Sequence, residues 1–289
     1  MALRLDDKYA LITGAGRGLG LEMAIAMGEA GLAGITITAA PGSDETSTQI
    51  DNELQEAVSI IEKTGTKVNA IVSDVGRSDD CKNAVDSHMQ SFPSLDILIN
   101  NAGKAGRYAH RGETDNDISG HDPAGIAEII ETNLCGPYFM LHHALPYMRK
   151  LTKARVINIS KRTESMHRKA WSPYGPTKAA LEAATIAWAE SLSETGVTVN
   201  TLSPGGAVNT KFGTGKISGH GIDPRTIRPM TVWLASDASD GFNGCRFVAD
   251  RWDPALSSLD AALGCQESQI FPRPERDTPL KRAWMDDLG

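Results

Sequence analysis

The chain has 289 residues, of which 40% are hydrophobic and 22% are charged, which suits a single α/β domain and excludes a disordered chain. The formal net charge of −7 disfavours broad binding to nucleic acid or to anionic membranes. No apolar run approaches the roughly 18 residues of a membrane span, and the first residues lack the pattern of a signal peptide, so we expect a soluble, cytoplasmic protein.

In chain order, β-branched segments alternate with segments of helical periodicity. Strands are expected at residues 9–13, 35–39, 68–73, 95–100, 156–160, 197–202 and 247–249. Helices are expected at residues 19–30, 52–64, 78–91, 124–151 (with a break near Gly136) and 174–195. Such alternation is typical of a parallel sheet with helices on both faces. The sequence therefore predicts an α/β, Rossmann-type, doubly wound parallel sheet in three layers, α/β/α, as a single domain over residues 1–250.

The segments between and beyond these elements show no clear period. Residues 41–51 and 103–123 are polar and predict long loops, the second of them near a ligand. Residues 206–223 hold five glycines, which suits a closing loop. Residues 251–289 carry four prolines and predict an extended tail that packs on the domain or on a neighbouring subunit.

A glycine-rich segment, Thr13-Gly14-Ala15-Gly16-Arg17-Gly18-Leu19-Gly20, directly follows the first expected strand and opens a helix. Glycines let the backbone turn sharply and approach a pyrophosphate, whose charge then meets the helix N-terminus. The segment therefore predicts a dinucleotide-binding loop made by Gly14, Gly16, Arg17, Gly18, Leu19 and Gly20.

The spacing Thr-Gly-x-x-x-Gly-x-Gly resembles that of the short-chain dehydrogenase/reductase superfamily, and further landmarks of the superfamily follow in order. They are Asp74-Val75, Asn100-Asn101-Ala102-Gly103, Asn133, Tyr174-x-x-x-Lys178 and Pro204-Gly205. The resemblance covers about residues 5–250. It implies a nicotinamide cofactor, a substrate lid at residues 206–223, and an oxidoreductase that interconverts a secondary alcohol and a ketone by hydride transfer.

Tyr174 and Lys178 stand four residues apart, which places a phenol and an ammonium on the same face of one helix. A nearby cation favours the phenolate of a tyrosine, whose ordinary pKa near 10 is too high for proton exchange at neutral pH. By resemblance, Tyr174 is the general acid/base, while Lys178 lowers its pKa and holds the nicotinamide ribose. Asn133 matches the asparagine that supports a water linked to this lysine.

One landmark of the superfamily is missing. A serine that binds the substrate oxygen normally stands thirteen residues before the tyrosine, where this chain has Lys161. Ser160 precedes it, on the opposite face of a regular strand. Three alternatives stay open: Ser160 or Thr163 takes the role after a local bulge, Lys161 donates to the carbonyl or to an anionic substrate group, or the function is lost. On the first alternative we count Ser160 among the catalytic residues; the last leads to a non-catalytic, dinucleotide-sensing protein.

The end of the second expected strand bears on the choice of cofactor. NAD-preferring folds place an acid there, but this chain has Ala39 and Ala40. Without an acid a 2′-phosphate is not repelled, and Arg17 offers it a charge-assisted hydrogen bond. We therefore expect NADP(H) as the preferred cofactor and NAD(H) as the alternative. By resemblance, the remaining cofactor contacts are Ala39, Ser43, Asp74, Val75, Asn101, Ala102, Gly103, Tyr174, Lys178, Pro204 and Gly205.

Two segments expected near the substrate are basic although the chain is acidic. They contribute Lys104, Arg107, His110 and Arg111, and Lys161, Arg162, His167, Arg168 and Lys169. This clustering favours an anionic small-molecule substrate, with solvated loops or a subunit contact as the alternative. The helix from Tyr174 is apolar nearly all round, which favours a homodimer or homotetramer. The four cysteines are too widely spaced for a metal site or a disulfide framework.

Overall fold

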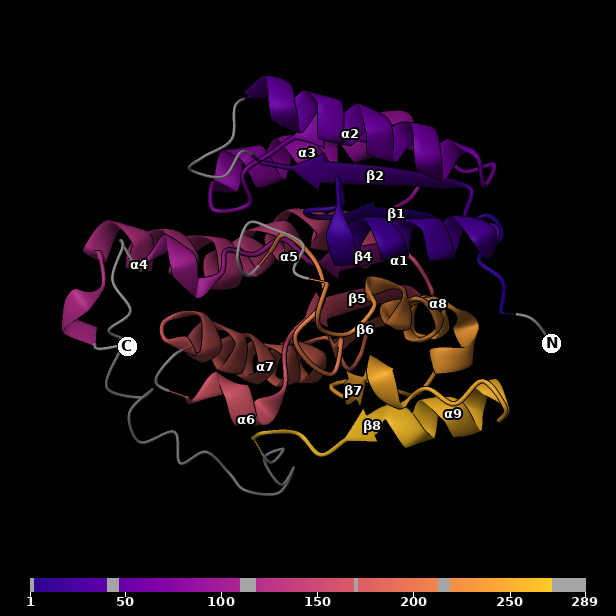
Figure 1. The fold of residues 1–289 in the computed structure, drawn as a ribbon. Helices are drawn as coiled ribbons and strands as arrows, with labels where there is room; N and C mark the ends of the chain where they lie inside the picture. Colours follow the sequence, from indigo (N-terminus) through magenta and orange to yellow (C-terminus); the bar gives the residue numbers. More distant parts are fainter. Residues whose placement is uncertain (1–2, 41–46, 110–117, 169–170, 213–218, 272–289) are drawn as a thin grey trace, which may run out of the picture.

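The computed structural model describes residues 3–40, 47–109, 118–168, 171–212 and 219–271. Its centre is an eight-stranded sheet in the order β3-β2-β1-β4-β5-β6-β7-β8 (Figure 1). The parallel strands are β1 (Tyr9–Ile12), β2 (Gly34–Ala39), β3 (Lys67–Val72), β4 (Ile97–Asn100), β5 (Ala154–Ile159), β6 (Val197–Ser203) and β7 (Arg246–Val248). β8 (Gln266–Glu267) pairs antiparallel with β7. The predicted doubly wound parallel sheet is confirmed, with one short antiparallel strand added at its edge.

Helices cover both faces of this sheet. They are α1 (Gly18–Glu29), α2 (Ser47–Glu62), α3 (Ser78–Ser91), α4 (Pro123–Ile130), α5 (Gly136–Met148), α6 (Thr163–Met166), α7 (Tyr174–Ser191), α8 (Arg228–Ala235) and α9 (Ser258–Cys265). Among the described residues, no helix is both long enough and apolar enough to cross a membrane.

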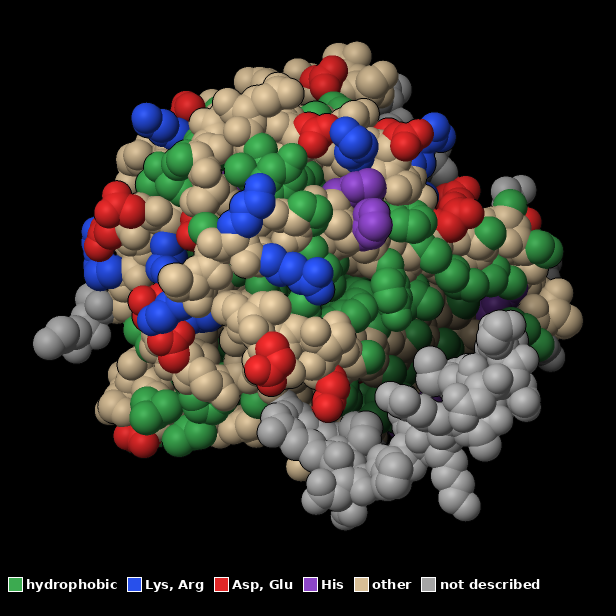
Figure 2. Space-filling view, turned by 180° about the vertical axis from the view of Figure 1, so that it is seen from behind, with side chains coloured by type: hydrophobic (Ala, Val, Ile, Leu, Met, Phe, Trp, Pro, Cys, Tyr) green, Lys and Arg blue, Asp and Glu red, His purple; other side chains and the backbone are tan. Residues whose placement is uncertain are grey.

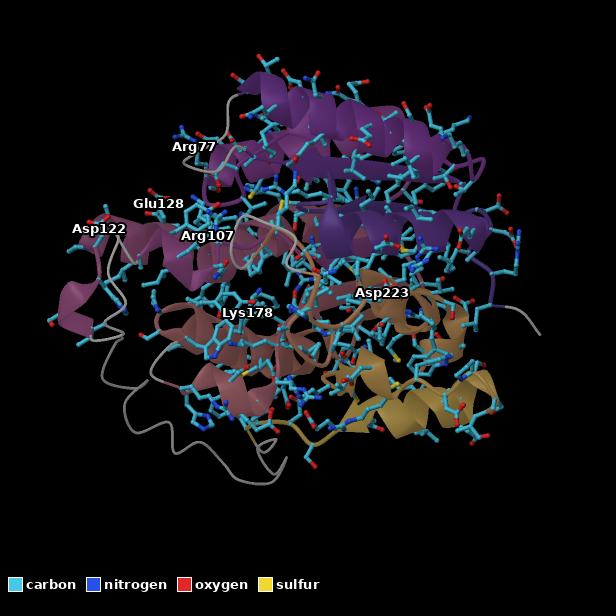
Figure 3. The ribbon with its side chains drawn as sticks, in the orientation of Figure 1. Arg77, Arg107, Asp122, Glu128, Lys178 and Asp223 are labelled. Atoms are coloured by element: carbon cyan, nitrogen blue, oxygen red, sulfur yellow. The ribbon has the colours of Figure 1, made fainter. Side chains whose placement is uncertain are left out.

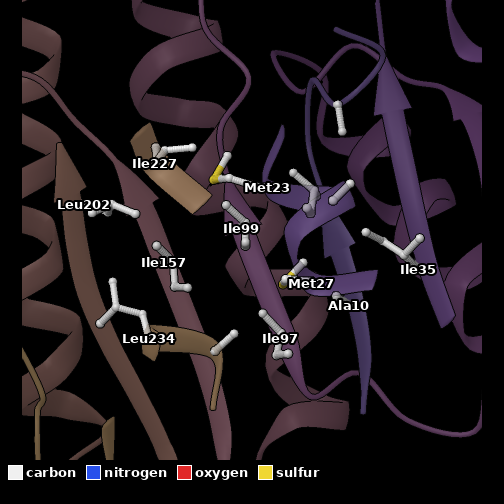
Figure 4. Packing of buried hydrophobic residues seen from close by; sticks show 14 of the residues in the cluster. Ala10, Met23, Met27, Ile35, Ile97, Ile99, Ile157, Leu202, Ile227 and Leu234 are labelled. Atoms are coloured by element: carbon white, nitrogen blue, oxygen red, sulfur yellow. The ribbon is translucent and has the colours of Figure 1, made fainter. Parts of the chain in front are cut away.

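Two buried hydrophobic clusters lie on the two faces of the sheet. Successive residues of a strand point to opposite faces, so Ala10 and Ile12 of β1 join one cluster while Leu11 joins the other. The first cluster lies under α1, α2, α8 and α9, and Figure 4 shows Met23 and Met27 of α1 beside its strand residues. The second lies under α3, α5 and α7. Burial on both faces explains why the central strands are nearly continuous apolar runs.

The helical boundaries differ from the prediction in two places. α2 begins at Ser47, inside the loop expected at residues 41–51, because Ile50 starts the buried stripe that continues through Leu54 and Ile61. The rest of that loop, residues 41–46, lies outside the described residues. The expected break near Gly136 is replaced by a π-helical turn, Glu131–Cys135, through which α4 continues into α5.

The sequence predicted an extended tail after residue 250, but part of this segment forms a helix and a short strand. Ser257 caps α9 by accepting a hydrogen bond from the Asp260 backbone N–H, and Ala262 and Cys265 pack into the first hydrophobic cluster. β8 then joins the sheet at its edge. α8 and α9 each span two turns, too few for a clear periodic signal in the sequence. Residues 272–289 lie outside the described residues.

A buried ion pair joins the last strands to α7. The side chain of Arg246 on β7 has no exposed surface and donates to Glu182 of α7, to the Lys161 carbonyl at 2.8 Å and to Glu267 at 2.8 Å. Ser160 donates to the same Glu182 carboxylate at 2.5 Å. These contacts fix the chain immediately after β5 against both α7 and β7.

We expect Arg246→Met to lower the free energy of unfolding by about 3–5 kcal/mol, because it leaves the buried Glu182 carboxylate without its counter-charge. Adding Glu182→Leu removes that charge too, so the double variant is expected to recover part of the loss. Denaturant unfolding of the wild type, both single variants and the double variant measures the coupling. Additive losses would contradict this account of the pair.

Candidate active site

The glycine-rich loop lies where the sequence places it, between β1 and α1. Gly14 has a positive φ of 65°, and a Cβ there would lie 2.9 Å from the Ala102 Cα atom. A Cβ on Gly20 would lie 2.4 Å from the Gly14 carbonyl oxygen. The N-terminus of α1 has no side-chain cap and no acid in its first turn. The loop therefore presents a close-packed backbone and an uncapped helix N-terminus, the two features that suit a pyrophosphate.

The loop after β4 is joined to the glycine-rich loop by hydrogen bonds. The Asn101 amide donates to the Thr13 and Gly14 carbonyls, both at 2.9 Å, and the Thr13 hydroxyl accepts from the Asn101 and Ala102 backbone N–H groups at 3.0 Å. The Asn-Asn-Ala-Gly landmark thus holds the glycine-rich loop in shape, in addition to any contact of its own with a cofactor.

Asn133 connects this region to α7. Its side chain, fully buried in the π-helical turn, accepts from the Lys104 N–H at 2.7 Å and donates to the Lys104 carbonyl at 2.9 Å. It also donates to the Thr177 hydroxyl at 3.2 Å. A Cβ on Gly103 would lie 3.1 Å from the Asn133 Oδ1 atom. Asn133 therefore positions the loop after β4 against the first turn of α7.

Tyr174 and Lys178 both lie buried in the first turns of α7. Lys178 donates from Nζ to the Ile159 carbonyl at 2.9 Å, at the end of β5. Burial lowers the pKa of Lys178 to about 8. The negative charge of Glu182 acts in the opposite direction and offsets part of this lowering. Burial raises the pKa of the Tyr174 phenol above its ordinary value. Figure 3 shows Lys178 at the same end of the sheet as Arg107 and Glu128, which follow β4.

The side chains of Ser160 and Lys161 have different partners. The Ser160 hydroxyl donates to Glu182, and its catalytic role stays a prediction. The Lys161 ammonium instead lies 4.8 Å from the centroid of the Tyr174 ring and 3.8 Å from that of Trp171. β5 keeps its regular parallel register through Ile159, and the Ser160 N–H donates to the Leu202 carbonyl at 2.9 Å.

Lys161 is 9% exposed, and its Nζ donates to the Ser165 carbonyl at 3.2 Å. Burial lowers its pKa to about 8, with further lowering from the positive charges of Lys178 and Arg168. A buried ammonium beside an acid/base candidate therefore stands at the position where the superfamily has a neutral serine.

The segment after Pro204 and Gly205 comes close to Tyr174. The Phe212 ring lies 5.6 Å from the Tyr174 ring, centroid to centroid. Val208 pairs with Ile222 at the base of this segment, which closes the expected lid into a loop. Residues 213–218 of the expected lid lie outside the described residues.

The adenosine end of the expected cofactor site contains an acid that the sequence analysis did not identify. Arg17 donates to both carboxylate oxygens of Glu53 on α2, at 3.0 and 2.9 Å, and Lys211 donates to the same carboxylate at 3.5 Å. Ala39 is the last residue of β2. Its Cβ atom would lie 3.5 Å from a Cβ added to Gly16, so the end of β2 packs closely against the glycine-rich loop. The boundary expected for α2 already placed Glu53 in the first turn of a helix, but nothing in the sequence indicated that the helix faces Arg17.

Two further residues expected at the cofactor site remain predictions. Asp74 accepts a hydrogen bond from the Gly76 N–H at 3.0 Å, which shapes the turn after β3 beside the buried Val75. Ser43 lies outside the described residues.

Some of the basic side chains in the two basic segments form ion pairs with acidic side chains of the same chain. Lys104 pairs with Glu128 at 3.1 Å, and Arg162 pairs with Asp250 at 3.2 Å. The Arg107 guanidinium lies 4.6 Å from the centroid of the Tyr108 ring. His110, Arg111 and Lys169 lie outside the described residues. Within the described residues, no group of three or more His, Cys, Asp or Glu side chains could hold a metal ion.

We expect Lys161→Met to raise the free energy of unfolding at pH 7 by about 1 kcal/mol. The lowering of its pKa from 10.5 to about 8 corresponds to a cost of about 3 kcal/mol for burying the charge. Loss of the aromatic contacts offsets about 1–2 kcal/mol of that gain. Because the folded pKa lies below the unfolded one, the wild type gains stability as pH rises from about 8 to 10.5, and the variant gains less.

Denaturant unfolding at pH 7 and pH 10 checks this difference between the two proteins. Lys150→Met is the matched control, because Lys150 is exposed and its Nζ lies 5.6 Å from the Tyr147 ring centroid. A clear loss of stability in Lys161→Met would contradict the burial argument.

Comparison with known proteins gives this arrangement a family. The family model for short chain dehydrogenases matches residues 8–218. The uncharacterized oxidoreductase YhdF of Bacillus subtilis is 30% identical over 267 residues, 85% of this chain and 86% of that protein. L-fucose dehydrogenase of Bos taurus is 30% identical over 205 residues, 71% of this chain and 68% of that protein.

A solved structure shows the same fold. It is that of a Sinorhizobium meliloti protein assigned to the short-chain alcohol dehydrogenases, 28% identical, with a TM-score of 0.73 over 86% of this chain and 97% of that one. The glycine-rich loop, the sheet order and the Tyr174–Lys178 pair agree with this assignment. The chain therefore belongs to the short chain dehydrogenase family and is an oxidoreductase.

Proposed function

We propose that the protein interconverts a secondary alcohol and a ketone with a nicotinamide dinucleotide, using Tyr174 as the general acid/base. One observation carries the proposal: Tyr174 and Lys178 lie buried one helical turn apart on α7, at the end of the sheet where the glycine-rich loop opens. Relatives of the chain include proteins named L-fucose dehydrogenase and 2-dehydro-3-deoxy-D-gluconate 5-dehydrogenase. These names support dehydrogenase chemistry on small hydroxyl compounds.

The residues present fit a dinucleotide. A Cβ on Gly14 or Gly20 would clash with the backbone of the loop, and the residue at the α1 N-cap, Arg17, does not cap the helix with its side chain. Lys178 uses one of its three N–H donors on the Ile159 carbonyl, which leaves two for the hydroxyl groups of the nicotinamide ribose. When bound, the nicotinamide supplies a hydride acceptor or donor.

Proton transfer falls to Tyr174. In the oxidation direction the Tyr174 phenolate would accept the proton of the alcohol oxygen, and in the reduction direction the Tyr174 phenol would return a proton to the carbonyl oxygen. Burial alone opposes the phenolate, so Tyr174 depends on the positive charges of Lys178 and Lys161. Asn133, with its hydrogen bonds to Lys104 and Thr177, positions the helix turn that carries these groups.

We retain NADP(H) as the preferred cofactor, with NAD(H) as the alternative. β2 ends without an acid at Ala39, and Arg17 stands at the N-terminus of α1. The Arg17–Glu53 pair is partly exposed, with side chains 37% and 25% exposed, so a 2′-phosphate can compete with Glu53 for the guanidinium. If Glu53 keeps Arg17, its carboxylate becomes a partner for a ribose hydroxyl, and NAD(H) is favoured instead.

We also propose that the protein is a homodimer or a homotetramer. Ile130 and Tyr138 are 39% and 46% exposed, and Trp188 of α7 packs edge-on against the Tyr138 ring. Figure 2 shows hydrophobic side chains gathered on the face opposite to that of Figure 1. Large exposed apolar areas mark contact surfaces between proteins, and α7 is the helix for which the sequence predicts one.

A second candidate function, a non-catalytic protein that senses dinucleotides, is favoured by the lysine at the serine position. The same experiment separates the two. Tyr174→Phe is expected to lower turnover of secondary alcohols by about 10²–10⁴-fold, because the general acid/base is lost. The dissociation constant of NADPH is expected to stay within about threefold, since the ring remains.

A panel of secondary alcohols with NADP⁺ or NAD⁺, followed by nicotinamide absorbance, provides the measurement. Tyr147→Phe on α5 is the control for loss of a phenol away from the site. Unchanged turnover in Tyr174→Phe would overturn the mechanism. If the wild type binds dinucleotide but oxidises nothing and reduces no ketone, the sensor function stands.

A further inference from the structure

We propose that the substrate carries a carboxylate one or two carbons from the carbon that reacts, and that Lys161 binds this carboxylate with Arg168 beside it. The inference rests on the proposed function and names its substrate class. The protein would then act on short 2- or 3-hydroxy acids, or on the corresponding oxo acids, in place of neutral alcohols.

The position of Lys161 is fixed from two sides. Arg246 donates to its backbone carbonyl at 2.8 Å, directly after β5. Its ammonium is held between aromatic rings, 3.8 Å from the Trp171 centroid and 4.8 Å from the Tyr174 centroid. A cation held over rings is fixed in place without being neutralised, because a ring offers a quadrupole and no net charge.

Positive charge accumulates around Tyr174. The Lys161 ammonium is close enough to Lys178 and Arg168 for both to disfavour its protonation. Within the described residues, no carboxylate forms an ion pair with Lys161 or Arg168, whereas Lys104 and Arg162 each have one. Arg168 donates from Nε to the Glu164 backbone carbonyl. A buried charge without a counter-charge is costly, and an anionic ligand would supply the missing one.

The nearest buried carboxylate is already engaged. The Glu182 carboxylate accepts hydrogen bonds from Arg246 and from the Ser160 hydroxyl. Lys161 spends one of its three N–H donors on the Ser165 carbonyl. Its remaining donors suit the two oxygens of a carboxylate better than a single neutral carbonyl oxygen. One buried ammonium also matches a monoanion better than a dianionic phosphate.

Distance sets the chain length of the substrate. The reacting oxygen must reach the Tyr174 phenol, and the ammonium lies only 4.8 Å from the centre of the same ring. Carboxylate and reacting carbon are therefore near neighbours in the substrate. Trp171 and Phe212, which flank Tyr174 and are 38% and 39% exposed, leave an apolar wall for a short hydrocarbon remainder.

The test compares acids with their neutral methyl esters. Racemic 2- and 3-hydroxybutyrate and their methyl esters are assayed with the wild type and NADP⁺ or NAD⁺. We expect kcat/KM to favour the better acid over its ester by at least about 30-fold, the size of a charge-assisted hydrogen bond. Lys161→Met is expected to remove this preference, so that kcat/KM falls by about that factor more for the acid than for the ester, whatever loss the two substrates share.

Two further variants sharpen the result. Arg168→Met, at an exposed position, is expected to lower kcat/KM for the acid by about threefold to tenfold, as a partly exposed charge should. Lys150→Met on an exposed surface should leave both substrates unchanged. If the wild type turns over the esters as well as the acids, the carboxylate site is overturned. If Tyr174→Phe also abolishes that turnover, the proposed function remains intact.

A binding measurement keeps the inference testable without turnover. Calorimetric titration of the NADPH-loaded protein with propionate and with propionamide is expected to show binding of the acid only, abolished in Lys161→Met. Equal binding of both compounds, or acid binding that survives Lys161→Met, would refute the proposal. If propionate binds through Lys161 while no hydroxy or oxo compound reacts, the carboxylate site stands and the proposed function fails.

Discussion

The buried ion pair between Arg246 and Glu182 fixes the carboxyl end of β5, and the rest of the site depends on it. Arg246 holds the Lys161 carbonyl, and Glu182 takes the Ser160 hydroxyl. With the backbone held in this way, the Lys161 ammonium lies 4.8 Å from the centroid of the Tyr174 ring. The group beside the acid/base is thus held in place by a charge pair that joins β7 to α7 and contacts the Lys161 backbone.

The two halves of the site use polar groups differently. Around the glycine-rich loop, the buried donors and acceptors of Thr13, Asn101 and Asn133 are paired with each other or with backbone groups. Around Tyr174, Lys161 and Lys178 keep donors in excess of their protein partners and have pKa values lowered by burial. Paired groups make a rigid platform, whereas an excess of buried positive charge costs stability that a bound anion restores. This difference supports our proposal that one half binds the cofactor phosphates and the other half carries out the chemistry.

Most of the fold was predictable because the central strands are apolar and parallel. Each of the seven expected strands lies in the sheet, since a β-branched run between helical segments leaves little choice of structure. α8 and α9 were not predicted, because two turns give no usable period. β8 was not predicted because two residues of strand, Gln266 and Glu267, carry no pattern at all.

The site was predictable to the extent that it is local in sequence. The glycine-rich loop and the Tyr174–Lys178 pair each lie within eight residues of chain, and both are formed as expected. Glu53 was missed because its contact with Arg17 joins residues 36 positions apart. The hydrogen bond from Ser160 to Glu182 could not be predicted either, because it depends on the packing of α7.

The central claim is that the glycine-rich loop and the start of α7 form one dinucleotide site. Isothermal titration of the full chain with NADPH and with NADH tests it most directly. Saturable binding of one dinucleotide per chain, tighter for NADPH, is the result this account predicts. Tighter binding of NADH would reverse the argument about Arg17 and Glu53 while leaving the site in place, and no binding of either dinucleotide would contradict the account.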